Sequence, residues 1–96
     1  MEDIVYYNEL YDLYGGLLTE TQKKYFEDYY FHNLSFSEMA ENYGVSRNAA
    51  FKQIHIVTDK LEEYERVLQL KKKKEEILLI TKTLDEDVRK KIEDIL

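Results

Sequence analysis

The chain has 96 residues, no cysteine, no proline, three glycines and a formal net charge of −6 at pH 7. The length fits one domain, the lack of cysteine excludes disulfides and zinc–thiolate sites, and the few turn-forming residues argue against an all-β domain. The negative charge argues against a protein that is strongly basic overall, as many nucleic-acid-binding proteins are.

No apolar run approaches the roughly 18–20 residues needed to cross a bilayer. The N-terminal residues Met1–Asp3 are acidic, whereas a signal peptide begins with basic residues. We therefore expect a cytoplasmic protein with no membrane partner.

The first predicted helix has a tyrosine-rich stripe and ends or bends at Gly15–Gly16. The stripe recurs at spacings of three and four residues, which is the helical period. Such a stripe predicts a buried face, and a platform for a ligand is the alternative. Its members are Ile4, Tyr7, Tyr11, Tyr14 and Leu18.

Two capping boxes predict the starts of the next two helices: T-x-x-Q at Thr19 and S-x-x-E at Ser35. We expect the second helix to end at His32–Asn33 and the third, short helix to end at Gly44. The predicted buried residues of these two helices are Tyr25, Phe26, Tyr29, Tyr30, Phe36, Met39, Ala40 and Tyr43.

Ser46 is the predicted cap of a long fourth helix over residues 47–69. Its predicted buried stripe is Ala50, Ile54, Val57, Leu61, Tyr64 and Leu68. A further capping box at Thr83 predicts a last helix, whose apolar side is Leu84, Val88, Ile92 and Ile95. We expect a helix-turn-helix domain over residues 1–70, then a charged linker and a C-terminal amphipathic helix over residues 71–96.

Residues 36–50 show the pattern of a helix-turn-helix. Ala40 is small where two helices cross, Gly44 lies in the turn, and Val45 is expected to fill the angle between the helices. The second helix of such a motif inserts its N-terminal residues into the major groove of DNA. Once the buried positions are removed, the candidate DNA-binding residues are Ser46, Arg47, Asn48, Phe51, Lys52 and His55.

The chemistry of these side chains suits DNA. Ser46 and Lys52 suit phosphate, Arg47 suits guanine or phosphate, and Asn48 suits adenine. Phe51 fits either a thymine methyl group or a protein partner. Residues 46–58 contain two basic and no acidic residues, whereas residues 1–18 contain four acidic and no basic ones. The total of −6 therefore does not describe this segment.

Residues 4–70 resemble the YlxM family of small bacterial helix-turn-helix proteins, which are similar to region 4 of sigma factors. The resemblance implies a DNA-binding regulatory protein with a role in the signal recognition particle pathway, and so a protein partner in the targeting machinery. The chain departs from the family at Asn48, Ala50, Phe51 and Lys52, so a family sequence preference does not transfer. The matching residues are Leu17–Thr19, Gln22, Tyr25, Tyr29, Tyr30, Ser35, Glu38–Glu41, Gly44–Arg47, Ala49, Ile54 and Leu61–Glu65.

The expected fold is therefore an all-α helical bundle with a sigma-region-4-like helix-turn-helix, a long fourth helix and a C-terminal helical tail. We expect no catalytic residues, no metal and no cofactor, since His32 and His55 lie on different predicted elements without a ligand motif. The four lysines at 71–74 are either a solvated helix end beside the C-terminal dipole or a phosphate contact.

The apolar tail either folds back or pairs with a second chain, and we expect a homodimer through the long helix or the tail. The acidic residues around the basic segment leave a second function open: a protein-interaction adaptor on a helix-turn-helix scaffold that does not bind DNA.

Overall fold

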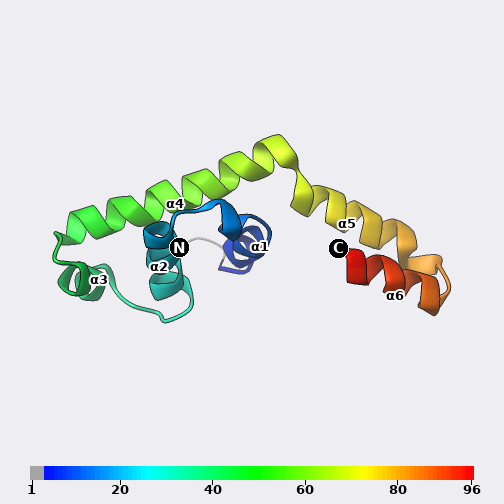
Figure 1. The fold of residues 1–96 in the computed structure, drawn as a ribbon, viewed down its shortest axis with the longest axis horizontal. Helices are drawn as coiled ribbons and strands as arrows, with labels where there is room; N and C mark the ends of the chain where they lie inside the picture. Colours follow the sequence, from blue (N-terminus) through cyan, green and yellow to red (C-terminus); the bar gives the residue numbers. More distant parts are fainter. Residues whose placement is uncertain (1–3) are drawn as a thin grey trace.

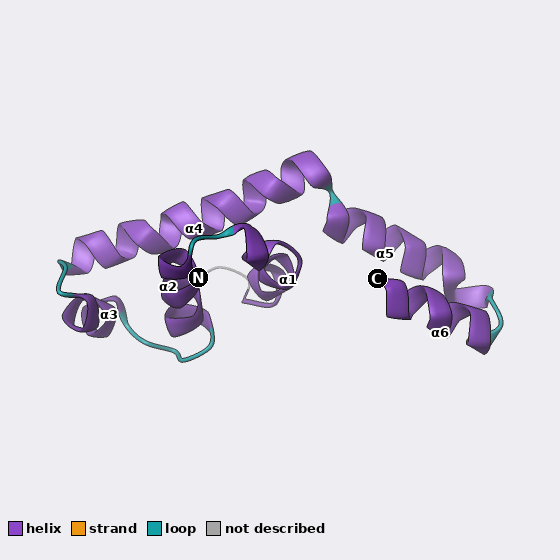
Figure 2. Cartoon of the chain, in the orientation of Figure 1, coloured by secondary structure: helices purple, strands orange, loops and turns teal. Residues whose placement is uncertain are grey.

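The computed structural model describes residues 4–96, which form helices and short 3₁₀ turns and contain no strand (Figure 2). This confirms the predicted all-α class. The helices are α1 (Ile4–Tyr14), α2 (Glu20–Tyr30), α3 (Phe36–Tyr43), α4 (Arg47–Leu68), α5 (Leu70–Ile80) and α6 (Glu86–Ile95), with 3₁₀ turns at Gly15–Leu17 and Thr81–Thr83.

The molecule is elongated. Helices α1, α2 and α3 pack against the long helix α4, and the hairpin of α5 and α6 extends away from its C-terminal end (Figure 1). The radius of gyration is 16.6 Å and the extents are 53 × 25 × 24 Å, whereas a compact domain of this size has a radius of about 13 Å. The hairpin accounts for the difference.

Three predicted N-caps are confirmed and one is wrong. Thr19 and Ser35 form full capping boxes, and the Ser46 hydroxyl accepts a hydrogen bond from the Ala49 N–H. Thr83 caps nothing, because residues 81–83 continue from α5 as a 3₁₀ turn instead of adopting the extended backbone of an N-cap. Helix α6 therefore begins at Glu86, and Asp85 precedes it without a side-chain cap.

The core lies between α4 and the first three helices. Tyr14 and Leu18 of the predicted stripe are buried, and Tyr7 and Tyr11 pack against the core. Leu10, which the stripe missed, is fully buried. Ile4 begins α1 and is 52% exposed, so its predicted burial is wrong. The buried hydrophobic residues are Leu10, Tyr14, Leu18, Tyr25, Phe26, Tyr30, Met39, Ala40, Ala50, Ile54, Val57 and Leu61.

Helix α4 leaves the core over its last turns. Its predicted stripe is buried as far as Leu61, Tyr64 is half-buried, and Leu68 is 42% exposed, against expectation. The helix ends at Leu68 because Gln69 adopts a left-handed backbone with φ 55°. Where we expected a charged linker, α5 begins at once, so Lys71–Lys74 lie near the start of a helix and not beside a C-terminal dipole. The division into two domains stays a prediction.

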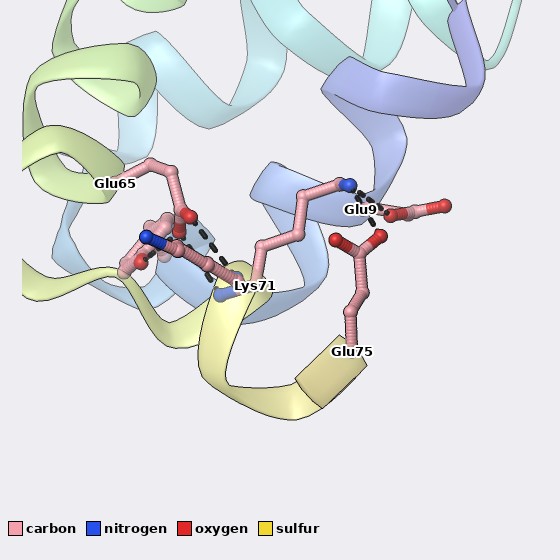
Figure 3. A network of polar contacts seen from close by, with 6 residues as sticks. Glu9, Glu65, Lys71 and Glu75 are labelled. Atoms are coloured by element: carbon pink, nitrogen blue, oxygen red, sulfur yellow. Dashed lines mark hydrogen bonds and ion pairs between the residues drawn. The ribbon is translucent and has the colours of Figure 1, made fainter. Parts of the chain in front are cut away.

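The junction of α4 and α5 is held by a polar network that joins three helices (Figure 3). Glu65 of α4 accepts hydrogen bonds from the backbone N–H groups of Lys71 and Lys72, at 3.0 and 3.2 Å, and so caps α5. The Lys71 ammonium pairs with Glu75 at 2.7 Å and with Glu9 of α1 at 3.3 Å. The start of α5 is thereby fixed to α1.

Tyrosine hydroxyls link helices to one another through carboxylates. Tyr11 of α1 donates to Glu27 of α2 at 2.5 Å, and Tyr7 of α1 donates to Glu62 of α4 at 2.9 Å. Burial, followed by the hydrogen bond to Glu27, raises the pKa of the Tyr11 hydroxyl. Several acids that contribute to the charge of −6 are therefore structural. No helix within residues 4–96 is both long and apolar enough to cross a membrane.

Candidate nucleic-acid interface

The turn between α3 and α4 has the geometry that the sequence predicts, apart from one side chain. Gly44 takes a left-handed backbone with φ 65°, which a residue with a side chain rarely adopts. Val45 is 40% exposed, so it does not fill the angle between the helices. Its backbone N–H donates to the Ala40 carbonyl at 3.0 Å and thereby helps to end α3.

Buried residues from both helices of the motif fix their crossing. Met39 and Ala40 of α3 and Ala50 and Ile54 of α4 all belong to the core. Because Ala50 and Ile54 occupy one face of α4, the first turns of the helix present their other face to solvent. All six candidate residues are exposed, namely Ser46, Arg47, Asn48, Phe51, Lys52 and His55.

Three of the six candidates form one aromatic cluster with Phe36: Arg47 and Phe51 contact its ring, and His55 contacts the ring of Phe51. The Arg47 guanidinium carbon lies 5.8 Å from the centre of that ring, and the Phe51 ring meets it edge-on at 5.2 Å. His55 lies one turn after Phe51, and the centres of their rings are 4.4 Å apart. These contacts give Arg47 and the two rings a defined position on the surface without burying them.

Asn48 and Lys52 lie one turn apart on α4 and stand outside this aromatic cluster. Among the residues that the structure describes, neither Lys52 nor Arg47 forms an ion pair, whereas Arg66 further along α4 is paired with Glu63. Two positive charges therefore face solvent near the N-terminus of α4, where the helix dipole also favours an anion. The first acid on the helix is Asp59.

Phe36 belongs to the site although its sequence position predicts a core residue. We expected it to be buried with Met39, but it is half-buried and lies between the core and the exposed cluster. Its ring stacks on that of Tyr29 at 5.0 Å, so α2 supports the site through α3. The one sequence signal for its partial exposure is its position. Phe36 is the first residue of a short helix, and such a residue often lies at the edge of a core.

A second contact joins α2 to α3 behind the site. Tyr43 stacks on Tyr25 with 4.4 Å between ring centres, and its hydroxyl donates a hydrogen bond to Asp28. Burial, followed by the hydrogen bond to Asp28, raises the pKa of Tyr43 to about 12. The hydroxyl therefore stays protonated as a donor at physiological pH, and α3 is held in place beneath the turn.

The described part of the chain contains no cluster of three or more His and acidic side chains arranged to hold a metal ion. His32 follows the end of α2, whereas His55 lies on α4. What the arrangement offers is an exposed, cationic and aromatic helix face.

Comparison with known proteins identifies the family. Residues 1–95 match the family model UPF0122, described as "Putative helix-turn-helix protein, YlxM / p13 like". A UPF0122 protein of Ureaplasma urealyticum is 44% identical over 87 residues, which is 90% of this chain and 88% of that protein. One from Halalkalibacterium halodurans is 43% identical over 83 residues, covering 86% and 76% of the two chains. This chain therefore belongs to the UPF0122 family of YlxM/p13-like helix-turn-helix proteins.

Proposed function

We propose that this protein is a DNA-binding regulatory protein whose recognition helix is the N-terminal half of α4. The observation that carries the proposal is that Arg47 and Lys52 are both exposed and form no ion pair within residues 4–96. They lie on the second helix of a helix-turn-helix, in a segment that contains no acidic residue. The proposed role is not catalytic, and we propose that the protein acts in the cytoplasm.

Each candidate residue has a part that suits its chemistry. Lys52 and the N-terminus of α4 at Ser46 contact phosphates, since an ammonium and free helical N–H groups both attract anions. Asn48 contacts a base edge, where its amide pairs with adenine, and the Arg47 guanidinium contacts guanine and a neighbouring phosphate. Phe51 and His55 lie where the helix meets the floor of the major groove, and Phe51 suits a thymine methyl group.

Affinity for duplex DNA comes mostly from neutralising phosphates, so two cations give weak binding per copy. Mobility shift with genomic fragments over a series of salt concentrations tests the proposal. We expect log K to fall with log salt at a slope near −2 for each bound copy. Lys52→Ala reduces that slope by about one per copy, and Lys82→Ala, remote on the hairpin, leaves it unchanged. Binding that is absent at low salt, or equal slopes for both variants, contradicts the proposal.

A second candidate function is a protein-interaction adaptor, and the acids of α4 favour it. Asp59, Glu62 and Glu63 are exposed on the same helix as the candidate interface and repel phosphate. Affinity capture after nuclease treatment separates the two functions, because an adaptor keeps its partners without nucleic acid. A place in the signal recognition particle pathway stays a prediction from the family resemblance.

A further inference from the structure

The hairpin of α5 and α6 carries apolar surface that nothing in the described chain covers. Neither helix contains a fully buried residue. Leu79 is 65% exposed, Ile80 73% and Ile95 85%. Helices of ten or eleven residues gain most of their stability from packing, so an uncovered pair of this length is marginal in water. The hairpin therefore needs an apolar partner surface.

One face of the hairpin combines two hollows with an exposed apolar side chain. A cavity of about 350 Å³, lined by Glu9, Asp12, Leu13, Lys71, Lys74, Glu75 and Leu78, lies between α1 and α5. Beside it, a cavity of about 330 Å³ is lined by Leu13, Leu70, Lys73, Lys74, Ile77, Ile95 and Leu96. Five of these seven residues are apolar, and the most exposed of the large apolar side chains, Ile95, stands at the edge of this apolar cavity.

An exposed apolar side chain at the edge of an apolar hollow lets a face pair with a copy of itself. A half-turn about an axis beside Ile95 brings this side chain of each copy to the hollow of the other, which is the arrangement of a two-fold dimer. We propose that two copies of this chain associate through this face, each placing Ile95 in the apolar cavity of the other. The proposal concerns a surface distant from the candidate nucleic-acid interface and does not depend on DNA binding.

The charges at the edge of the face support a second copy over an unrelated partner. Asp12 on the α1 side and Lys73 and Lys74 on the α5 side are exposed, and none forms an ion pair within residues 4–96. A half-turn exchanges the two sides, so Asp12 of one copy meets Lys73 and Lys74 of the other. A surface edge with a negative and a positive side is complementary to a second copy of the same edge after a half-turn. A partner that carried charges of one sign would be repelled by one of the two sides.

Sedimentation equilibrium of the full chain tests the proposal, with Ile95→Asp as the variant and Ile80→Asp as its matched control. Both residues are exposed isoleucines on the hairpin, but Ile80 lines neither cavity. We expect a dimer for the wild type, a dissociation constant raised at least about thirtyfold by Ile95→Asp, and little change from Ile80→Asp. Far-ultraviolet circular dichroism checks that both variants stay helical.

A mixing experiment tests the charged edge without removing any apolar contact. Asp12→Lys and Lys74→Asp each place like charges opposite one another in a dimer of one variant. When the two variants are mixed, three of the four charge pairs across the two-fold axis are of opposite sign, against two in the Lys74→Asp dimer and none in the Asp12→Lys dimer. We therefore expect the mixture to form heterodimers more readily than either variant self-associates.

Three results overturn the proposal: a monomeric wild type at every accessible concentration, equal effects of Ile95→Asp and Ile80→Asp, or no preference for the heterodimer in the mixture. None of them affects the proposed DNA binding of a single copy, which rests on α4.

Discussion

The Tyr14 hydroxyl donates a 2.5 Å hydrogen bond to Glu65, although 51 positions separate the two residues. The same hydroxyl oxygen accepts the Leu70 N–H at 3.0 Å, so Tyr14 and Glu65 together bind the first backbone groups of α5. A helix usually takes its cap from the residue just before it. Here the cap comes from the core of the helix-turn-helix, which couples the direction of the hairpin to the packing of α1 on α4.

Removing the Tyr14 hydroxyl is expected to destabilise the protein while keeping the ring packed. Tyr14→Phe leaves the Leu70 N–H without its acceptor and removes a donor to a carboxylate, so we expect a loss of about 1.5–3 kcal/mol in the free energy of unfolding. Urea unfolding measures it. Tyr64→Phe is the control, because the half-buried Tyr64 packs against the core and its hydroxyl forms no hydrogen bond within residues 4–96. Equal losses for both variants would remove the special role of Tyr14.

The Glu65 carboxylate makes the protein more stable near neutral pH than in acid. Burial, the largest single effect, acts to raise its pKa, but the hydrogen bonds from Tyr14 and from the N–H groups of Lys71 and Lys72 together hold that pKa below the ordinary 4.5. Because the folded state favours the ionised form, its stabilisation is complete above 4.5 and is lost as the pH falls through the lower folded value.

Glu65→Gln tests this pH dependence. We expect the variant to be less stable than the wild type at neutral pH, and the gap in unfolding free energy to narrow well below the ordinary carboxyl pKa of 4.5. Unfolding curves at a series of pH values give the gap directly. A gap that stays constant across that series would mean that the carboxylate's charge has no part in capping α5.

Ile54 is expected to be essential to the crossing of the helix-turn-helix. It is 3% exposed, whereas Ile56, two residues later on the same helix, is 44% exposed. Ile54→Ala therefore removes buried apolar volume and is expected to cost about 2–5 kcal/mol, while Ile56→Ala costs little. The comparison by urea unfolding would contradict the register of α4 if the two costs were alike.

Gly44 and Gly16 are expected to respond differently to alanine. A Cβ at either position meets no atom within 4 Å, but only Gly44 has a positive φ. Gly44→Ala is therefore expected to cost about 1–2 kcal/mol through its backbone alone, whereas Gly16→Ala is expected to be neutral or slightly stabilising. Thermal unfolding of the two variants measures the difference, and a neutral Gly44→Ala would show that the turn tolerates another conformation.

Local signals in the sequence were sufficient for the first four helices. The capping residues Thr19, Ser35 and Ser46 each act on groups within three residues, so their effect can be read without knowing the fold. The same signal failed at Thr83, where the turn that continues from α5 prevented the extended backbone of a cap.

Contacts between distant residues could not be predicted in this way. The bonds from Tyr7 to Glu62 and from Tyr14 to Glu65 join residues more than fifty positions apart, and no spacing rule pairs them. In the candidate site, the helical period alone separated the exposed residues of α4 from the buried ones. The support from Phe36 and Tyr29 depends on how α2 and α3 pack and was not visible from the sequence.

The central claim, that the N-terminal half of α4 binds DNA, is tested most directly by fluorescence anisotropy with mixed promoter DNA at low salt. The wild type is compared with the Arg47→Ala/Lys52→Ala double variant, and helicity confirms that both are folded. We predict that the wild type binds and that the double variant loses most of that binding, because the two free cations of the candidate interface are gone. Negligible binding by both proteins, or equal binding by both, would contradict the account.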